Sequence, residues 1–263
     1  MFGVHSGVAF HAPVLSHGAA SVPGPKPRAR HLALLASGRR RGPITQLITP
    51  WNIGKQTRPF VSLEYAEATA GLEAVSGPHP QPGTATLVAV LGGRVLFEHA
   101  NGAHGEVNAG GSAWVHAPHV TWRGESGMQQ PLRVFQLGVS LTASQPTAPA
   151  VSDEIEPHYP EEAGPVRVIL GQFGRTRSPL RSFAADINLL HVSLNDDEVW
   201  RYCTPEGHNL TWLAVERGGL ELNGGERVYW EQIGVFDESA GLIEVQADGD
   251  TSFLLGSARR DPR

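Results

Sequence analysis

The sequence predicts an all-β protein made of two small antiparallel β-barrels, and three observations support this prediction. Glycine and proline contribute 31 and 20 of the 263 residues, a composition typical of short elements separated by many turns. Short runs rich in β-branched and aromatic residues alternate with these turns, and no segment shows a 3.6-residue apolar period over ten or more positions. A glycine-centred pattern also occurs twice, about 120 residues apart.

Five strands are expected in the first half of the chain, because five short apolar or alternating runs are bounded there by turn residues. They are Pro59–Tyr65, Thr86–Leu91, Arg94–His99, Gly111–His116 and Arg133–Leu141. Gly92 and Gly93 separate the second run from the third. Two glycines supply the positive φ angles of a primed turn at little cost, so we expect a β-hairpin at this point.

The strand pattern resumes after a segment that is first rich in Ser, Thr and Pro and then acidic. The expected strands are Val166–Leu170, Asn188–Leu194, Asn209–Glu216, Gly219–Asn223, Leu242–Ala247 and Ser252–Leu255. The run Val90–Leu96 recurs loosely as Val215–Glu221, and a Gly-Glu pair follows each run. We therefore expect a duplicated barrel; a chance similarity between Gly-rich hairpins is the alternative.

These patterns divide the chain into a head at 1–43, a barrel at 44–140, a linker at 141–164 and a second barrel at 165–258. The head contains six basic residues and no acidic one. It has no strand pattern, so we expect it to lie outside the folded core, as a disordered tail or the product of a start codon assigned too far upstream. An organellar transit peptide and a tail that binds an acidic partner are the alternatives.

Composition excludes several classes of protein. No window approaches 18 consecutive apolar residues, so no transmembrane helix is expected. The net charge is −5 and no basic domain stands out, which argues against direct binding of nucleic acid. Cys203 is the only cysteine, which excludes an intramolecular disulfide and a thiolate zinc site. A single thiol, expected to be inert, fits a reducing compartment, and we expect the protein in the cytoplasm.

Three segments resemble the pirin family of bicupins. Residues 77–93, which begin Gly-Pro-His-Pro-Gln-Pro-Gly-Thr, stand where that family has a His-Pro-His-Arg-Gly-Phe-Glu-Thr run before a strand. Residues 58–65 are similar to its Asp-Pro-Phe strand, and residues 111–125 to its Gly-Asp-x-x-Trp segment. The resemblance covers roughly 44–256. It implies two antiparallel, jelly-roll-like barrels packed face to face.

The resemblance also implies a metal site, which in pirins consists of three His and one Glu around one iron-type metal in the first barrel. These positions fall on His79, Gln81, Arg123 and Glu125, and the acidic residue that follows the His pair in the family falls on Ala85. Guanidinium stays protonated, has no lone pair to donate and repels a cation. We therefore expect a vacant site and no cofactor; Fe or another divalent first-row metal is expected only if the family site survives.

Two further arrangements are possible around these positions. Arg123 and Glu125 would form an ion pair where the metal would have been, or Arg123 would turn to solvent. His116 and His119 flank Ala117-Pro118 and are the candidate ligands of a displaced metal site together with His79. A loop or surface role is the simpler alternative for these histidines.

The resemblance leaves two functions open, and no catalytic residue is assigned. The first is a non-catalytic protein that binds a small molecule or a partner protein, as some pirins do with transcription factors or metabolic enzymes. The second is a metal-dependent oxidoreductase similar to quercetin 2,3-dioxygenase. Sugar or seed-storage-like binding is compatible with the fold, but no residue favours it. The metal content separates the first two, and the reversions Gln81→His and Arg123→His are expected to raise it.

Overall fold

The computed structural model describes residues 29–69, 84–99, 102, 104–115, 120–127, 130–140, 162–178, 180, 187–223, 225–239 and 241–260. Within these residues every regular element is a β-strand. No helix in the described part of the chain is long and apolar enough to cross a bilayer. The protein therefore has the all-β class that its sequence predicts.

The N-terminal lobe is formed by two sheets that face each other. Its strands are β2 (Arg39–Arg41), β3 (Ile44–Ile48), β4 (Phe60–Ala68), β5 (Thr84–Gly92), β6 (Arg94–His99), β7 (His104–Asn108), β8 (Ser112–Val115), β9 (Val120–Glu125) and β10 (Leu132–Ser140). One sheet has the order β2-β3-β4-β10-β5-β8, and the other has the order β7-β6-β9. Neighbouring strands are antiparallel throughout both sheets.

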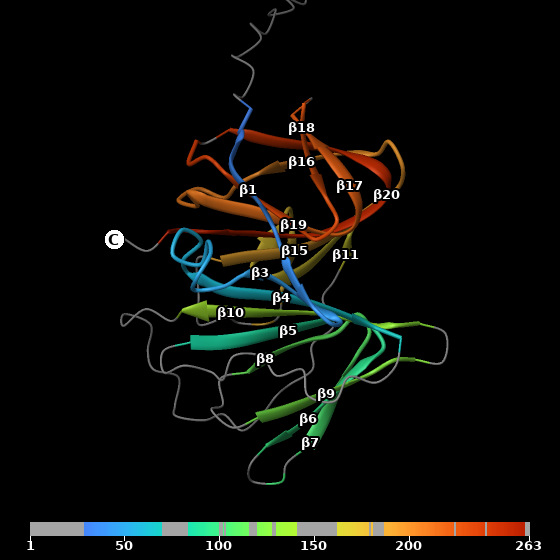
Figure 1. Cartoon of the computed structure of the whole chain (residues 1–263). Coiled ribbons are helices and arrows are strands. Elements are labelled where there is room, and N and C mark those ends of the chain that lie inside the picture. Colours follow the sequence, from blue (N-terminus) through green and yellow to red (C-terminus); the bar gives the residue numbers. More distant parts are fainter. Residues whose placement is uncertain are drawn as a thin grey trace, which may run out of the picture.

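The C-terminal lobe is built on one nine-stranded sheet. Its strands are β1 (Leu32–Ser37), β11 (Glu162–Ala163), β12 (Val166–Leu170), β15 (Ile187–Leu194), β16 (Val199–Cys203), β17 (Leu210–Leu222), β18 (Glu226–Tyr229), β19 (Gln232–Phe236) and β20 (Leu242–Ala258). The order is β1-β19-β17-β20-β15-β12-β11, with β16 on β20 and β18 on β17. A separate hairpin joins β13 (Gln172–Phe173) to β14 (Thr176–Arg177). The two lobes are stacked on each other (Figure 1).

The two lobes repeat one topology. In the N-terminal lobe β5 pairs with β8 and β10, while β6 pairs with β7 and β9. In the C-terminal lobe the first half of β17 pairs with β19 and the end of β20, and its second half pairs with β18 and the start of β20. The strand β17 thus corresponds to β5 and β6 together, as the duplication predicted from the sequence requires.

The glycines at the repeated position turn the chain between layers. Gly93 has a φ of 70°, and it leads from β5 in one sheet to β6 in the other. The predicted β-hairpin at Gly92-Gly93 is therefore wrong, because β5 and β6 do not pair with each other. At the corresponding place β17 bends through two register shifts around Gly218, whose φ is 77°. Consequently the two strands expected at 209–223 are one bent strand.

A shared apolar core joins the lobes. Leu87, Ala89 and Leu91 on β5 face the C-terminal lobe, whereas Val88 and Val90 face the interior of their own lobe. The cluster between the lobes also contains large side chains from β4 and β10 and from the C-terminal strands β15, β17 and β20. Across this boundary the rings of Phe60 and Trp212 meet edge to face, with centroids 5.2 Å apart. Because both faces of these central strands are buried, they appear in the sequence as nearly continuous apolar runs.

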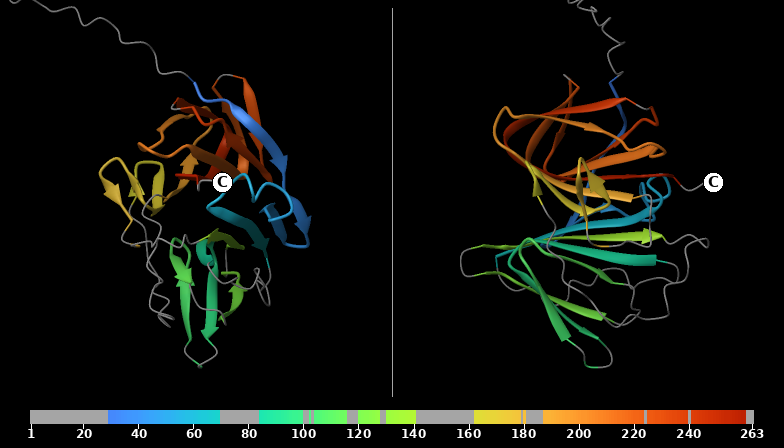
Figure 2. Two further views of the ribbon diagram at one scale, coloured as in Figure 1. Left: turned by 90° about the vertical axis from the view of Figure 1, so that its left-hand side faces the viewer. Right: turned by 180° about the vertical axis from the view of Figure 1, so that it is seen from behind.

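The basic head differs from its prediction. Strand β1 pairs with β19 along its whole length, and it lies along the C-terminal lobe (Figure 2). Just before it, Arg30 is fully buried; its Nη1 donates to Thr211 Oγ1 at 2.9 Å and its Nη2 donates to the Asp237 carbonyl. The expectation that residues 1–43 lie outside the core is therefore wrong for residues 29–43. Residues 1–28 lie outside the described part of the chain.

Candidate functional site

The predicted metal positions are only partly described. His79, Gln81, His116 and His119 lie outside the described residues, whereas Arg123 and Glu125 lie on β9.

The alternation along β9 decides which way these two residues face. Trp122, one position away from Arg123, packs against the core cluster of the N-terminal lobe and against Phe97 on β6. Successive strand residues point to opposite faces, so Arg123 and Glu125 lie on the outer face of the β7-β6-β9 sheet. Their side chains are 60% and 29% exposed. This placement separates both residues from the interior of the lobe.

The Glu125 carboxylate is held by two guanidinium groups. Its Oε2 atom accepts hydrogen bonds from Arg94 Nε at 2.8 Å and Nη2 at 2.6 Å, and its Oε1 atom lies 3.3 Å from Arg123 Nη2. The ion pair expected between Arg123 and Glu125 is therefore present, but it lies on the outer face of the lobe, and Arg123 is 60% exposed, as in the alternative that it turns to solvent. The hydrogen bond and the charge of Glu125 raise the pKa of Arg94 above its usual value.

The two described positions do not fit an iron-type metal. Arg123 has no lone pair to donate, and both oxygens of Glu125 already face cations on the outside of the lobe. Across the described ranges, no group of three or more His, Cys, Asp or Glu side chains is arranged to hold a metal ion.

A polar row on the inner face of the N-terminal lobe was missed by the sequence analysis. Gln46, Glu64 and Gln136 are direct cross-strand neighbours on β3, β4 and β10. Gln46 Nε2 donates to Glu64 Oε1 at 2.8 Å, and Glu64 is only 8% exposed. The alternation in β4, where Ser62 and Glu64 interrupt apolar residues, is the signal that identifies this inner face. The row offers two amides and a carboxylate inside the lobe.

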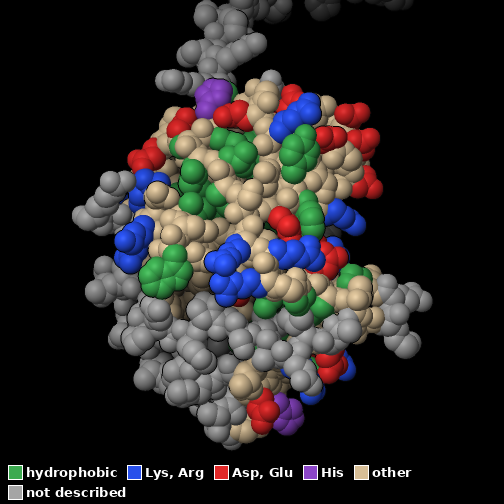
Figure 3. Space-filling model, in the orientation of Figure 1, with side chains coloured by type: hydrophobic (Ala, Val, Ile, Leu, Met, Phe, Trp, Pro, Cys, Tyr) green, Lys and Arg blue, Asp and Glu red, His purple; other side chains and the backbone are tan. Residues whose placement is uncertain are grey.

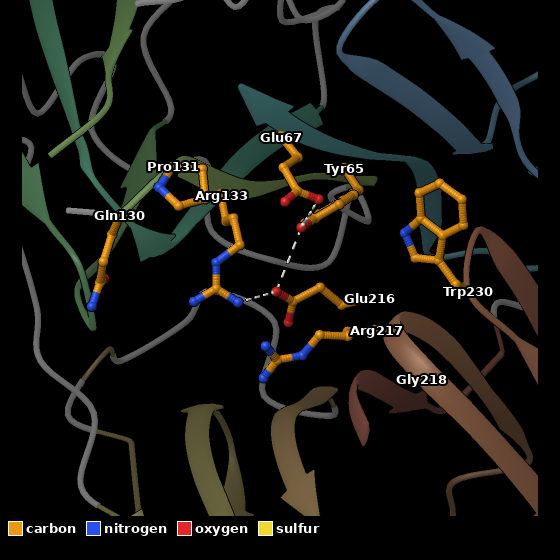
Figure 4. A pocket seen from close by; sticks show the side chains of 9 residues that line it. All are labelled: Tyr65, Glu67, Gln130, Pro131, Arg133, Glu216, Arg217, Gly218 and Trp230. Carbon is orange, nitrogen blue, oxygen red and sulfur yellow. Dashed lines mark hydrogen bonds and ion pairs between the residues drawn. The ribbon is translucent and has the colours of Figure 1, made fainter. Parts of the chain in front are cut away.

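A second buried carboxylate lies between the lobes. Glu216 on β17 is 1% exposed at its side chain. Its Oε1 atom accepts from Arg133 Nη1 at 2.6 Å and lies 3.5 Å from the Tyr65 hydroxyl (Figure 4). Its Oε2 atom is 3.0 Å from Ser252 Oγ and 3.1 Å from His191 Nε2. Arg133 and Tyr65 come from the N-terminal lobe, and the other residues come from the C-terminal lobe. The cluster therefore crosses the boundary between them.

Hydrogen bonds and charge keep Glu216 ionised. Burial raises the pKa of its carboxyl group, but the hydrogen bond and charge of His191 and the charge of Arg133 outweigh this effect and lower the pKa below 4.5. Burial and the neighbouring carboxylates raise the pKa of Tyr65 well above its usual range, so its phenol stays protonated. At neutral pH the cluster therefore contains a carboxylate that accepts and a phenol that donates.

An open pocket of about 480 Å³ adjoins this cluster, and both lobes contribute to it. It is lined by Tyr65, Glu67, Gln130, Pro131, Arg133, Glu216, Arg217, Gly218 and Trp230 (Figure 4). Charged side chains of both signs also gather over the boundary between the lobes on the face shown in Figure 3. Sequence reasoning placed Glu216 at the end of an expected strand and assigned no functional role to Trp230. It could not bring them together with Arg133, because their contacts depend on how the lobes dock.

A further cavity, of about 810 Å³, lies at one end of the C-terminal lobe and includes Asn188, Tyr202 and His208. The Tyr202 hydroxyl and His208 Nδ1 both hydrogen-bond to Ser257 Oγ, at 2.8 and 2.9 Å. Cys203, a free and exposed cysteine, lies at its edge. These polar side chains bond to one another, which accounts for their burial.

Known proteins are similar to this chain in sequence. No family model matches it. A Pseudomonas aeruginosa protein with the name "Putative quercetin 2,3-dioxygenase" is 27% identical over 229 residues, which cover 81% of this chain and 79% of that protein. A Vibrio cholerae protein with the same kind of name is 30% identical over 123 residues, or 43% of each chain.

Solved structures share its fold. A quercetin 2,3-dioxygenase from Acinetobacter baumannii superposes with a TM-score of 0.71 at 18% identity, covering 88% of each chain. The pirin YhhW from Escherichia coli, in complex with nickel(II), superposes with a TM-score of 0.62 at 17% identity, covering 87% of this chain and all of that one. These superpositions extend over both lobes, and they agree with the three sequence segments that resemble pirins. We conclude that the chain has the two-lobed, all-β fold of these structures and is similar in sequence to proteins with the name putative quercetin 2,3-dioxygenase.

Proposed function

We propose that this bicupin is a non-catalytic protein that binds a small molecule or a partner protein. The observation that carries the proposal is the state of Glu125, the carboxylate at a family metal-ligand position. It faces outward and is bound by Arg94 and Arg123. Two guanidinium groups already neutralise this carboxylate and would repel a cation placed beside it, so it is a poor ligand for a divalent metal.

The second candidate is a metal-dependent oxidoreductase similar to quercetin 2,3-dioxygenase. It is favoured by the names of the sequence relatives and by the nickel bound to YhhW. On this alternative the ligands would have to come from other residues, such as His79, His116 and His119, because Arg123 cannot donate a lone pair.

Elemental analysis of the protein purified without chelator separates the two functions. We expect well under one equivalent of Fe, Mn, Ni, Cu or Zn, and no loss of quercetin absorbance when the protein is mixed with quercetin in air. About one equivalent of metal together with quercetin consumption would overturn the proposal and establish the oxidoreductase.

Reversion of the ligand positions gives a sharper test, and the structure changes its expected result. The sequence alone predicts that Gln81→His with Arg123→His raises the metal content. Because Arg123 lies on the outer face, we now expect this double variant to stay below one equivalent. Arg94→Gln, which removes the other guanidinium from Glu125, is the matched control and is also expected to bind no metal. Stoichiometric metal in the double variant alone would show that β9 can present residue 123 to the interior.

A further inference from the structure

The pocket between the lobes is the cavity whose surroundings point most directly to a ligand. Its volume of about 480 Å³ lies within the range of about 300 to 1,000 Å³ that is common for small-molecule sites. Tyr65 and Glu67 on β4 and Arg133 on β10 approach it from one lobe, and Arg217 and Trp230 approach it from the other. Sites between two packed units are common places for ligands.

The two arginines that line the pocket, Arg133 and Arg217, differ in the contacts that their guanidinium groups make. Arg133 is held by Glu216 at 2.6 Å and by the Leu91 carbonyl at 3.3 Å, so its charge is balanced within the protein. Arg217 is the next residue along β17 and is exposed, and no described residue forms a hydrogen bond or ion pair with its guanidinium. A guanidinium offers a planar fork of donors that fits a carboxylate with two parallel hydrogen bonds. Among the described residues that line the pocket, Arg217 is therefore the arginine best placed to bind an anion.

An exposed aromatic side chain lines the same pocket as this guanidinium. Trp230 is 43% exposed, and its backbone N–H donates to the Gly218 carbonyl at 3.2 Å, which fixes it beside the bend that carries Arg217. Arg40 approaches the indole to 5.5 Å from the ring centroid. An exposed tryptophan in a pocket provides a flat apolar surface for a planar ligand.

The acidic residues limit the charge of the ligand. Glu216 is buried and ionised, and Glu67 accepts a hydrogen bond from the Tyr65 hydroxyl at 3.2 Å. Both carboxylates line the pocket, but Arg133 balances the charge of Glu216, so a second negative charge on a ligand would be repelled mainly by Glu67. A single carboxylate bound at Arg217 avoids this repulsion if the rest of the ligand is uncharged.

We propose that the pocket between the lobes binds a small aromatic monocarboxylate, with Arg217 holding the carboxylate and Trp230 contacting the ring. This inference deepens the proposed binding function by naming its site and ligand class. It involves neither the family metal positions nor an oxidation step.

Isothermal titration calorimetry with benzoate as the probe tests the proposal on the full-length protein. Benzamide has the same ring without charge, isophthalate adds a second carboxylate, and inorganic phosphate is an anion without a ring. We expect saturable binding of benzoate and at least about tenfold weaker binding of benzamide, the difference that one charge-assisted hydrogen-bond pair typically makes. Isophthalate should also bind at least about tenfold more weakly because its second charge is repelled, and phosphate because it has no ring to contact Trp230. Equal binding of benzoate and benzamide, or no saturable binding of benzoate, would overturn the proposal.

Variants of exposed residues then locate the site. Arg217→Gln should weaken benzoate binding at least about tenfold, and Arg217→Lys should weaken it less because the charge remains. Trp230→Ala should weaken benzoate but leave phosphate unchanged. Arg175→Gln, at an exposed arginine in the turn between β13 and β14, is the matched control and should bind benzoate like the wild type. Benzoate binding that survives both Arg217→Gln and Trp230→Ala would place it elsewhere and refute the assignment.

The two proposals fail separately. Metal and quercetin turnover in a protein that also binds benzoate through Arg217 would overturn the non-catalytic function and leave this pocket intact. A protein that contains no metal, does not consume quercetin and does not bind benzoate would agree with the proposed non-catalytic function. It would refute the assignment of this pocket as the binding site.

Discussion

The guanidinium of Arg133 in the N-terminal lobe lies 2.6 Å from Oε1 of Glu216 in the C-terminal lobe. The carboxylate is 1% exposed and the arginine side chain 25% exposed. This pair therefore joins the two lobes at a point where water reaches the cation but not the anion. Separation of the lobes would expose Glu216 to water and remove its partner.

Removal of the cation alone should destabilise the protein strongly. We expect Arg133→Met to lower the free energy of unfolding by about 3 to 5 kcal/mol, because it leaves a buried carboxylate without its fixed positive partner. Urea unfolding followed by tryptophan fluorescence measures the effect. The double variant Arg133→Met with Glu216→Gln should recover part of the loss, since the amide needs no counter-charge. A double variant whose loss equals the sum of the single losses would show that the two residues are not coupled.

Acid should weaken the protein through Glu216. Its pKa is lower in the folded protein than its ordinary value of 4.5, so between these two values the unfolded chain binds more protons. The stabilisation by this group is therefore complete above about pH 5 and is lost as the pH falls through the folded-state pKa. In urea unfolding between pH 7 and pH 3, the wild type should lose stability more steeply than Glu216→Gln. If the free energy of unfolding fell equally with pH in both proteins, Glu216 would not be the group responsible for the loss of stability in acid.

Truncation should separate the two parts of the basic head. Removing residues 1–28 should leave the melting temperature within a degree or two, because Arg30 and β1 remain. Removing residues 1–38 should lower it by more than about 5 °C, which corresponds to about 2 kcal/mol for a protein of this size. The longer deletion takes away a fully buried arginine and the partner strand of β19. Equal melting temperatures for the two truncations would show that β1 contributes nothing.

The corner at Gly93 should tolerate no side chain. A Cβ atom there would lie 2.4 Å from the carbonyl oxygen of Glu125 and 3.1 Å from the Cα atom of Leu132, both of which are backbone atoms, and the φ of 70° is unfavourable for alanine. We expect Gly93→Ala to cost about 2 kcal/mol or more in thermal unfolding. Gly42→Ala is the matched control, since its φ is 60° but nothing lies within 4 Å of the added atom. Its cost should be about 1 kcal/mol.

The strands that the sequence predicts best are those with both faces buried. Thr86–Leu91 was expected and β5 is Thr84–Gly92, because a continuous apolar run between turn residues is visible locally. The short strand β7, with the sequence His-Gly-Glu-Val-Asn, has one large apolar residue and gave no signal. Strand β1 alternates half-buried and exposed residues, but its partner β19 lies near the other end of the chain. Its role therefore could not be inferred from the surrounding basic segment.

The candidate sites were predicted only where a linear motif marks them. The pairing of Arg123 with Glu125 follows from two residues on one strand face, and it was predicted. The direction in which that face points depends on how β9 pairs with β6, which the motif does not contain. The partners of Glu216 come from β4, β10, β15 and β20, strands that are brought together only by the docking of two lobes. No spacing between residues in the sequence indicates that these side chains surround Glu216.

The position of β1 also has a consequence for biosynthesis. Because β1 pairs with β19, the first strand to leave the ribosome has no partner until almost the whole chain has been translated. The N-terminal lobe lies between these two strands in the sequence, so it can assemble while the C-terminal lobe still lacks an edge. The C-terminal lobe can therefore close only after β19 has been synthesised, and a chain that ends before Gln232 would leave the Leu32–Ser37 segment without its partner strand and open to proteases.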